Sequence, residues 1–471
     1  MKKFCYAKRL LSLLLVIMVL AVTGCSNKSD DGKDSTPTGK PSGTVGDNAG
    51  NEETPDDGTP SQVEAATIYW WTAWTPEAGI QDIIDKFNES YPQIEVIPVQ
   101  FSNNVDGNLK VDVTLSSGSG IDVFFNFGAD RINSRAQNDL LLDLSSYIEQ
   151  DGFDVENELG KDIYTLDGKY YALPATSNAY AVFLNKDMLD EAGLTTPTQW
   201  TMEEYYEYAR KMTSGSGDTK IYGSDAMRPY YQWLFMASNS FAANPWYNEA
   251  GVSNFDHPYY AKALELKYNA ENVEGIQYPY TESVSTKASP VDNFLNGKAA
   301  MVMYGNALAR NLADTEKYPH DFSVEVAPLP VAEEGAENYN IGGYFGYMGI
   351  NAKTAEPDAS WLFLKYLVTE GSYGFLKVGH IPTWKNTDWD AVVDETFNNN
   401  AEALINVEQF KNVILNQANM PQQSLTNFTA YSKITAIFET EFEGFIYGQN
   451  DIRTTINNLK AQADAAILAG D

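Results

Sequence analysis

The stretch TIYWWTAWTPEAGIQDIIDKFNESYPQIEVIPV, residues 67–99, decides the fold class of this chain. It opens with five β-branched or aromatic residues, which predict a buried strand. Thr75-Pro76-Glu77 then predicts a helix start, and apolar residues follow at helical spacing until Tyr91-Pro92 ends the helix. Residues 94–99 predict the next strand. Alternating strands and helices of this length are typical of an α/β fold.

The alternation continues along the chain. Residues 109–117 suit a helix that Gly118 ends, and residues 121–125 read as a third strand. Crossovers of this kind are right-handed and build a parallel sheet, which binds ligands at the carboxyl ends of its strands. We therefore expect ligand contacts in residues 71–74 and 126–130.

The N-terminal segment predicts where the protein is located in the cell. Residues 1–24 have a basic start and an apolar run that is too short to span a bilayer, which is typical of a signal peptide. Cys25, after Val22-Thr23-Gly24, resembles a bacterial lipobox, whose cysteine carries lipid such as palmitate. That resemblance implies a protein anchored on the extracellular face of the cell membrane of a Gram-positive-like bacterium. An ordinary cleavage site or an uncut anchor is the alternative.

Residues 25–65 predict a disordered tether, because they are rich in Ser, Asp, Gly, Pro, Thr and Asn. A flexible chain of about 40 residues has a root-mean-square reach of about 35 Å. Cys5, the other cysteine, lies in the signal peptide, so we expect no internal disulfide in the mature chain.

The net charge of the chain is −32, and removal of the signal peptide with its four basic residues leaves −36. Such a surface excludes nucleic acid as a partner, because phosphate binding depends on Lys and Arg. The chain also holds 29 Tyr, 22 Phe and 9 Trp. Some of these rings fill the core, and others are candidates for flat platforms on which a ligand stacks.

Six segments, in order, together resemble one known family. They are FNESYPQIEV (87–96), SGSGIDVF (117–124), GKYYALP (168–174) with VFLNKDML (182–189), FLNGKAAM (294–301), GGY (342–344) with WLFLKYL (361–367), and GHIPT (379–383). In this order they are similar to the family 1 extracellular solute-binding proteins of ABC importers, relatives of the maltose-binding protein. Ile121 stands where the family usually has proline.

The resemblance implies a two-lobed, type II periplasmic-binding-protein-like α/β fold with a hinged cleft between discontinuous lobes. Three chain crossings would place residues 66–175 and 340–383 in one lobe and residues 176–339 and 384–471 in the other. Residues 401–469 read as helix-rich, with breaks at Pro421 and near Gly448. The implied role is capture of a carbohydrate, in particular an oligosaccharide, and delivery to a membrane permease by a monomeric receptor.

A sugar requires aromatic platforms and planar hydrogen-bonding groups. The candidates lie after predicted strands, at the crossings, in turns, or at family positions: Trp74, Asn126, Asp130, Asn178, Tyr180, Trp233, Trp246, Asn306, Gly343, Tyr344 and Trp384. Several have a structural alternative. Asn126 and Asp130 suit helix capping, and Trp233 suits a core position.

Other chemistry finds little support. No phosphate-binding loop, dinucleotide fingerprint or nucleophile elbow is present, and the three histidines lack zinc-ligand spacing. We expect no catalytic residues, cofactor or metal. A polyamine is the second ligand class, because acids with aromatics would hold it. A secreted glycan-degrading enzyme and an adhesive lipoprotein are the alternatives of other classes.

Overall fold

The computed structural model describes residues 64–227, 229–415, 423 and 427–470. The predicted signal peptide, Cys25 and all but the last two residues of the predicted tether lie outside this range, as does Pro421. In the part of the chain that is described, no helix is long and apolar enough to cross a membrane.

The first sheet has six strands in the order β10-β4-β9-β3-β1-β2. β1 (Ala66–Thr72) pairs in parallel with β2 (Ile94–Gln100) and β3 (Val123–Phe127), which confirms the parallel arrangement predicted for these strands. β9 (Tyr344–Ile350), however, pairs antiparallel with β3 and with β4 (Ala172–Ser177). The sheet is therefore mixed, because β9 inserts from a distant part of the chain.

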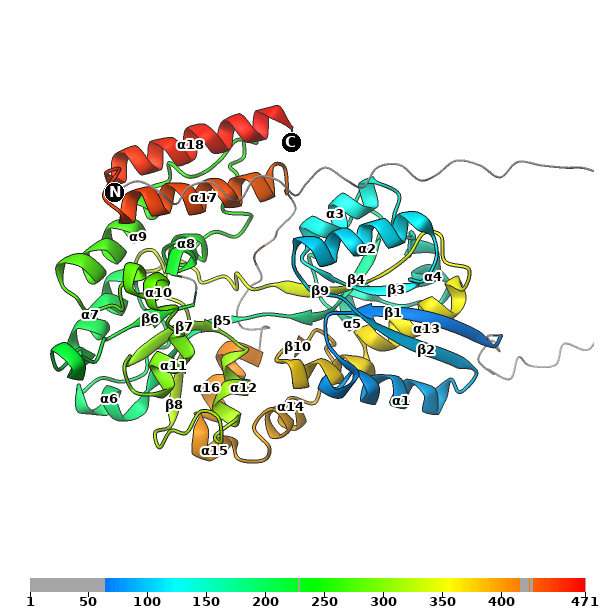
Figure 1. Ribbon diagram of the computed structural model, residues 1–471, viewed down its shortest axis with the longest axis horizontal. Coiled ribbons are helices and arrows are strands. Elements are labelled where there is room, and N and C mark those ends of the chain that lie inside the picture. Colours follow the sequence, from blue (N-terminus) through cyan, green and yellow to red (C-terminus); the bar gives the residue numbers. More distant parts are fainter. Residues whose placement is uncertain (1–63, 228, 416–422, 424–426, 471) are drawn as a thin grey trace, which may run out of the picture. The chain divides into compact units, whose positions relative to one another are not determined.

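Helices cover both faces of this sheet. Trp70 of β1 packs against Phe363 of α13 (Pro357–Val368), whereas Lys110 of α2 (Val105–Ser117) lies over the neighbouring Trp71. Successive strand residues point to opposite faces, so α13 and α2 lie on opposite sides (Figure 1). Trp70 and Trp71 are both buried, and neither ring is available to a ligand.

The predicted start of the first helix needs a correction. Thr75 makes no capping bond from its side chain, and Pro76–Ala78 forms only a short 3-10 turn, η1. Gly79 follows with φ +102°, in the left-handed region that interrupts a helix. α1 (Ile80–Ser90) therefore begins four residues after the proline and ends at Tyr91, as predicted.

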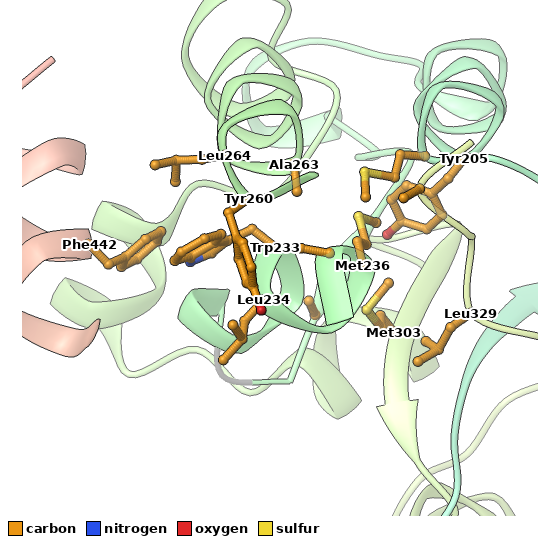
Figure 2. Packing of buried hydrophobic residues seen from close by; sticks show 14 of the residues in the cluster. Tyr205, Trp233, Leu234, Met236, Tyr260, Ala263, Leu264, Met303, Leu329 and Phe442 are labelled. Carbon is orange, nitrogen blue, oxygen red and sulfur yellow. The ribbon is translucent and has the colours of Figure 1, made fainter. Parts of the chain in front are cut away.

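The second sheet has four strands in the order β6-β7-β5-β8. β5 (Tyr180–Asn185) lies antiparallel between β7 (Met301–Gly305) and β8 (Val324–Ala327), and β6 (Asp225–Ala226) runs parallel to β7. A core of aromatic and aliphatic side chains packs beside this sheet. In Figure 2 the indole of Trp233 lies among this core, and its ring stacks on Phe442 with centroids 6.3 Å apart.

Local sequence accounts for several helix limits. Thr201 and Glu204 form a capping box at the start of α7 (Met202–Met212). Asn104 caps α2 by accepting from the Gly107 N–H. α17 (Tyr431–Ile446) and α18 (Ile452–Ala469) are joined near Gly448, as predicted, and run side by side (Figure 1).

The remaining helices are shorter than α17 and α18. They are α3 (Ala129–Gln137), α4 (Ser145–Gln150), α5 (Val155–Glu158), α6 (Lys186–Glu191), α8 (Pro229–Ser238), α9 (Pro258–Tyr268), α10 (Tyr280–Thr286), α11 (Pro290–Leu295), α12 (Leu308–Ala313), α14 (Trp389–Thr396), α15 (Ala401–Leu404) and α16 (Val407–Phe410). The 3-10 segments η2 (Gly217–Thr219) and η4 (Glu370–Val378) and the π-helical segments η3 (Asn269–Val273) and η5 (Lys411–Leu415) complete them.

The chain passes between the two sheets at places near the predicted crossings. β4 in the first sheet is followed directly by β5 in the second, through Asn178 and Ala179. The chain returns between β8 and β9, and β10 (Ile381–Pro382) precedes the last run of helices. Two sheets joined in this way form the two-lobed fold. The numbered limits of the lobes stay a prediction.

Candidate ligand-binding site

A cluster of rings lies beyond the carboxyl ends of β1 and β3. Trp74, half-buried in the loop after β1, contacts Phe125 and Phe127 at centroid distances of 4.9 and 5.9 Å. Phe127 in turn contacts Phe345 at the start of β9, 5.5 Å away. His380 closes the cluster, 5.2 Å from Trp74 and stacked on Phe345 at 5.4 Å. Loops from distant parts of the chain thus bring an aromatic surface together at the predicted edge of the sheet.

A cavity of about 270 Å³ opens beside this cluster, between the loop after β3, the start of β9 and the start of α17. Its lining is aromatic, glycine-rich and acidic. The lining residues are Phe127, Gly128, Ala129, Asp130, Asp162, Tyr164, Ile341, Gly342, Gly343, Tyr344, Phe345, Tyr347, Gln423, Phe428 and Tyr431. Lysine and arginine are absent from this described lining.

Asp130 supplies a carboxyl group to the cavity. It lies in the first turn of α3, whose N-terminal residue follows Gly128. Burial raises the pKa of this carboxyl, while Arg131 and the backbone N–H groups of the turn oppose the rise. Gly128 has φ +87°, and a Cβ there would stand 2.5 Å from the Asp130 Oδ1 atom. Glycine at position 128 thus leaves room for the carboxyl group.

Glycines also let two crossing segments touch. A Cβ on Gly342 would stand 2.1 Å from the carbonyl oxygen of Asn178, far closer than any real contact. The Asn178 N–H donates to the Gly343 carbonyl at 3.0 Å, and Asn340 Nδ2 donates to the Asn178 carbonyl at 3.4 Å. Asn178 is therefore held next to the glycines that line the cavity.

The structure brings five of the predicted site residues together at this place. Asp130, Gly343 and Tyr344 line the cavity, and Asn178 and Trp74 adjoin it through Gly343 and Phe127. The Tyr344 hydroxyl, which donates to the Lys161 carbonyl at 2.9 Å, is fixed by the protein itself.

Other predicted residues are engaged elsewhere. Asn126 is fully buried and accepts a hydrogen bond from Arg135. Asn306 uses both ends of its amide, because its Nδ2 donates to the Gly379 carbonyl and its Oδ1 accepts from the Ala179 N–H. These asparagines therefore belong to the framework of the fold rather than to the cavity.

The predicted tryptophans beyond Trp74 are packed against protein. Trp233 is 1% exposed in the core. Trp246, in its predicted turn, stacks on Tyr431 at 4.4 Å and is also buried. Trp384 donates its Nε1–H to Glu158 at 2.8 Å. We do not retain these three as ligand contacts.

Tyr180 lies at the start of β5 and packs on Phe235 of α8 at 4.6 Å. Both rings are half-buried, so this pair stays a candidate surface at the second sheet.

Several residues of the site are not among the individually named candidates. Phe127 and Phe345 carry its aromatic surface, and the cavity is also lined by Phe428, before α17, and by Tyr431, the first residue of α17. His380 was weighed only as a zinc ligand, although it lies in the Gly-x-x-Pro turn quoted for the family. Phe127 lies within residues 126–130, where the sequence predicts ligand contacts, although it is not named there as a single candidate.

No set of His, Cys, Asp and Glu side chains in the described ranges is arranged to hold a metal ion.

The two sheets and their connections define the two-lobed α/β fold of bacterial binding proteins. A sugar transporter of Rhizobium etli, solved in an open conformation, has this fold, with a TM-score of 0.72 at 18% identity over 85% of this chain and 99% of that one. The chain belongs to the bacterial extracellular solute-binding protein family, whose model matches residues 72–373.

Two curated relatives are similar along the sequence. The maltotriose-binding protein of Pyrococcus abyssi is 24% identical over 61% of this chain, which spans only 59% of that relative's length. The maltooligosaccharide ABC transporter solute-binding lipoprotein of Streptococcus pneumoniae is 22% identical over 86% of this chain and 89% of its own.

Proposed function

We propose that this protein is a lipid-anchored extracellular receptor of an ABC importer, and that it captures a carbohydrate, in particular an oligosaccharide. The observation that carries the proposal is the aromatic surface of Trp74, Phe127 and Phe345 beside a cavity with the Asp130 carboxyl group. Rings stack on the apolar faces of sugars, and a carboxylate accepts from their hydroxyls.

Charge narrows the ligand class further. An anionic ligand such as a glycerol phosphate or a sugar acid would meet the carboxylates of Asp130 and Asp162 in a cavity whose described lining holds no Lys or Arg. We therefore infer a neutral sugar. The same pair of acids with aromatic rings would also hold a polyamine, which is the second candidate.

The proposed mechanism is binding rather than chemistry. Ligand enters between the lobes, the crossings act as hinges, and the closed form docks on the membrane permease. Uptake then depends on ligand because the permease favours the closed form. The receptor is proposed to act as a monomer and without a cofactor.

A thermal-shift screen of the purified protein tests the ligand class. The panel holds maltotriose, other neutral oligosaccharides, spermidine and glycerol 3-phosphate. A raised Tm with a neutral oligosaccharide and none with glycerol 3-phosphate is expected. A raised Tm with spermidine alone would replace the sugar by a polyamine. Release of smaller sugars during incubation would point to a glycan-degrading enzyme instead.

Small-angle scattering tests hinge closure. We expect the radius of gyration to fall when a sugar that raises the Tm is added. A purely adhesive lipoprotein has no need of a hinge, so an unchanged radius with saturating sugar would count against the receptor.

The variant Cys25→Ala tests whether the protein is anchored to the membrane by lipid at Cys25. This variant should leave the membrane fraction, while its sugar binding stays that of the natural protein. A variant that is processed normally but remains with the membrane would refute lipid attachment at Cys25.

A further inference from the structure

His380 lies where two chain crossings meet the aromatic surface. Its Nδ1 atom is 3.3 Å from the Oδ1 atom of Asn178. Its backbone is tied to the same place, because the His380 N–H donates to the Phe375 carbonyl and the preceding Gly379 carbonyl accepts from Asn306. The imidazole is thus held against the side chain of Asn178 from a segment about 200 residues further along the chain.

The rings around His380 restrict its orientation. It stacks on Phe345 at 5.4 Å and meets Trp74 edge-on at 5.2 Å, with Phe125 at 6.4 Å. Burial, together with the nearby Arg310 charge, lowers the pKa of His380 to about 4. At neutral pH the ring is therefore uncharged and carries a single N–H. Since a carbonyl oxygen only accepts, a hydrogen bond between Nδ1 and the Asn178 oxygen requires that hydrogen on Nδ1.

The contact leaves the other end of the Asn178 amide available. An asparagine side chain has one oxygen acceptor and one NH2 group with two donor hydrogens. Its oxygen is occupied by His380, and its Nδ2 has no hydrogen-bond partner among the residues that the structure describes. The backbone of Asn178 also contacts Gly342 and Gly343, which line the cavity.

We propose that His380 is a positioning residue, whose Nδ1–H holds the Asn178 oxygen and so aims the Asn178 NH2 group at an acceptor oxygen of the ligand. The inference rests on the proposed function, because it requires a ligand with oxygen acceptors such as hydroxyls. Without His380 the amide is free to rotate, and its NH2 group is no longer held in one orientation. The site then no longer offers a preorganised hydrogen-bond donor to the ligand, so the affinity for the ligand falls.

The tautomer of His380 tests the first half of the proposal without any ligand. Nitrogen-15 NMR of the imidazoles distinguishes Nδ1–H from Nε2–H, and His380→Gln identifies the signal among those of the three histidines. The Nδ1–H tautomer is expected between pH 6 and 8. An Nε2–H tautomer would overturn the proposal, because Nδ1 would then have no hydrogen to donate.

Binding of maltotriose, or of the neutral oligosaccharide with the largest thermal shift, tests the second half. Asn178→Ala should raise Kd about tenfold, the worth of one hydrogen bond. His380→Leu, which keeps volume but has no donor, should raise Kd about threefold to tenfold. His380→Gln should restore much of the affinity, because its amide can donate to Asn178.

The double variant decides whether His380 acts through Asn178. We expect His380→Leu to add nothing when Asn178 is already alanine. A full additional loss in the double variant, or no loss from His380→Leu alone, would overturn the proposal. Failure of the natural protein to bind any sugar would instead refute the proposed function. If His380→Leu does not fold, the tautomer measurement on the natural protein still tests whether His380 can donate from Nδ1 to Asn178.

Discussion

Gly342→Ala probes the contact on which the crossing depends. The added Cβ would stand 2.1 Å from the Asn178 carbonyl oxygen and 2.5 Å from its carbon, where real contacts exceed 3 Å. Because the obstacle is backbone, the two segments must move apart by about 1 Å, since such overlap is not tolerated in a packed structure.

That movement breaks two hydrogen bonds, from the Asn178 N–H to the Gly343 carbonyl and from Asn340 Nδ2 to the Asn178 carbonyl. At about 1 kcal/mol each, the loss is about 2 kcal/mol of unfolding free energy. Urea unfolding followed by fluorescence measures it, and maltotriose binding should weaken in parallel because Asn178 shifts.

Gly444→Ala is the matched control. Gly444 lies inside α17, and its added Cβ would meet the flexible side-chain ends of Asn450, at 3.2 Å, and Gln449, at 3.9 Å. Alanine favours a helix by about 1 kcal/mol over glycine, so this variant should be as stable as the natural protein or more so. An unfolding free energy for Gly342→Ala equal to that of the natural protein would refute the reasoning about the crossing.

Three further perturbations are worth making. Lys267→Met leaves the Glu271 carboxylate without its counter-charge in the core, where both side chains are at most 1% exposed, although Glu271 keeps hydrogen bonds from Gln277 and the Tyr280 N–H. The variant should lose about 3–5 kcal/mol of unfolding free energy, measured by urea unfolding. Adding Glu271→Gln should recover much of this loss, and an equal loss in the double variant would contradict the reasoning. Burial lowers the pKa of His380 to about 4, so protonation of this ring opposes folding. The free energy of unfolding should therefore fall by about 2–3 kcal/mol on account of His380 as the pH is lowered from 6.5 towards 4. In His380→Gln the free energy of unfolding should fall less steeply over this range, and identical pH profiles for the two proteins would refute this. Asp130→Asn should raise the Kd for maltotriose at least tenfold with little change in Tm, whereas unchanged affinity would remove Asp130 from the site.

The local elements were predictable because their signals are local. The spacing of Ile80, Ile83, Ile84 and Phe87 predicted one buried helix face, and all four are buried in α1. The insertion of β9 between β3 and β4 was not predictable in the same way. The strands that pair with β9 lie more than 150 residues earlier in the chain, and the sequence of residues 344–350 does not indicate which strands they are.

The site was predictable only in part, for the same reason. Trp74, after β1, lies on the aromatic surface as its position indicated. Trp246 also looked available, because an Asn-Pro-Trp turn is usually exposed, but Tyr431 covers it. Asn126 and Trp384 lie at suitable ends of strands, yet Asn126 is fully buried with its oxygen bonded to Arg135, and the Trp384 Nε1–H is bonded to Glu158. A pattern shows which side chains can bind, and only the fold shows which of them are still available.

Calorimetric titration of the purified protein with neutral oligosaccharides tests the central claim most directly. The account predicts saturable one-to-one binding of a neutral oligosaccharide, and at least a tenfold weakening when Trp74 is replaced by alanine, since a stacking ring is lost. Trp384→Phe, which changes a ring bonded to Glu158 outside the cavity, should bind as the natural protein does. Binding of spermidine with no heat from any neutral sugar, or sugar binding that is indifferent to Trp74, would contradict the account.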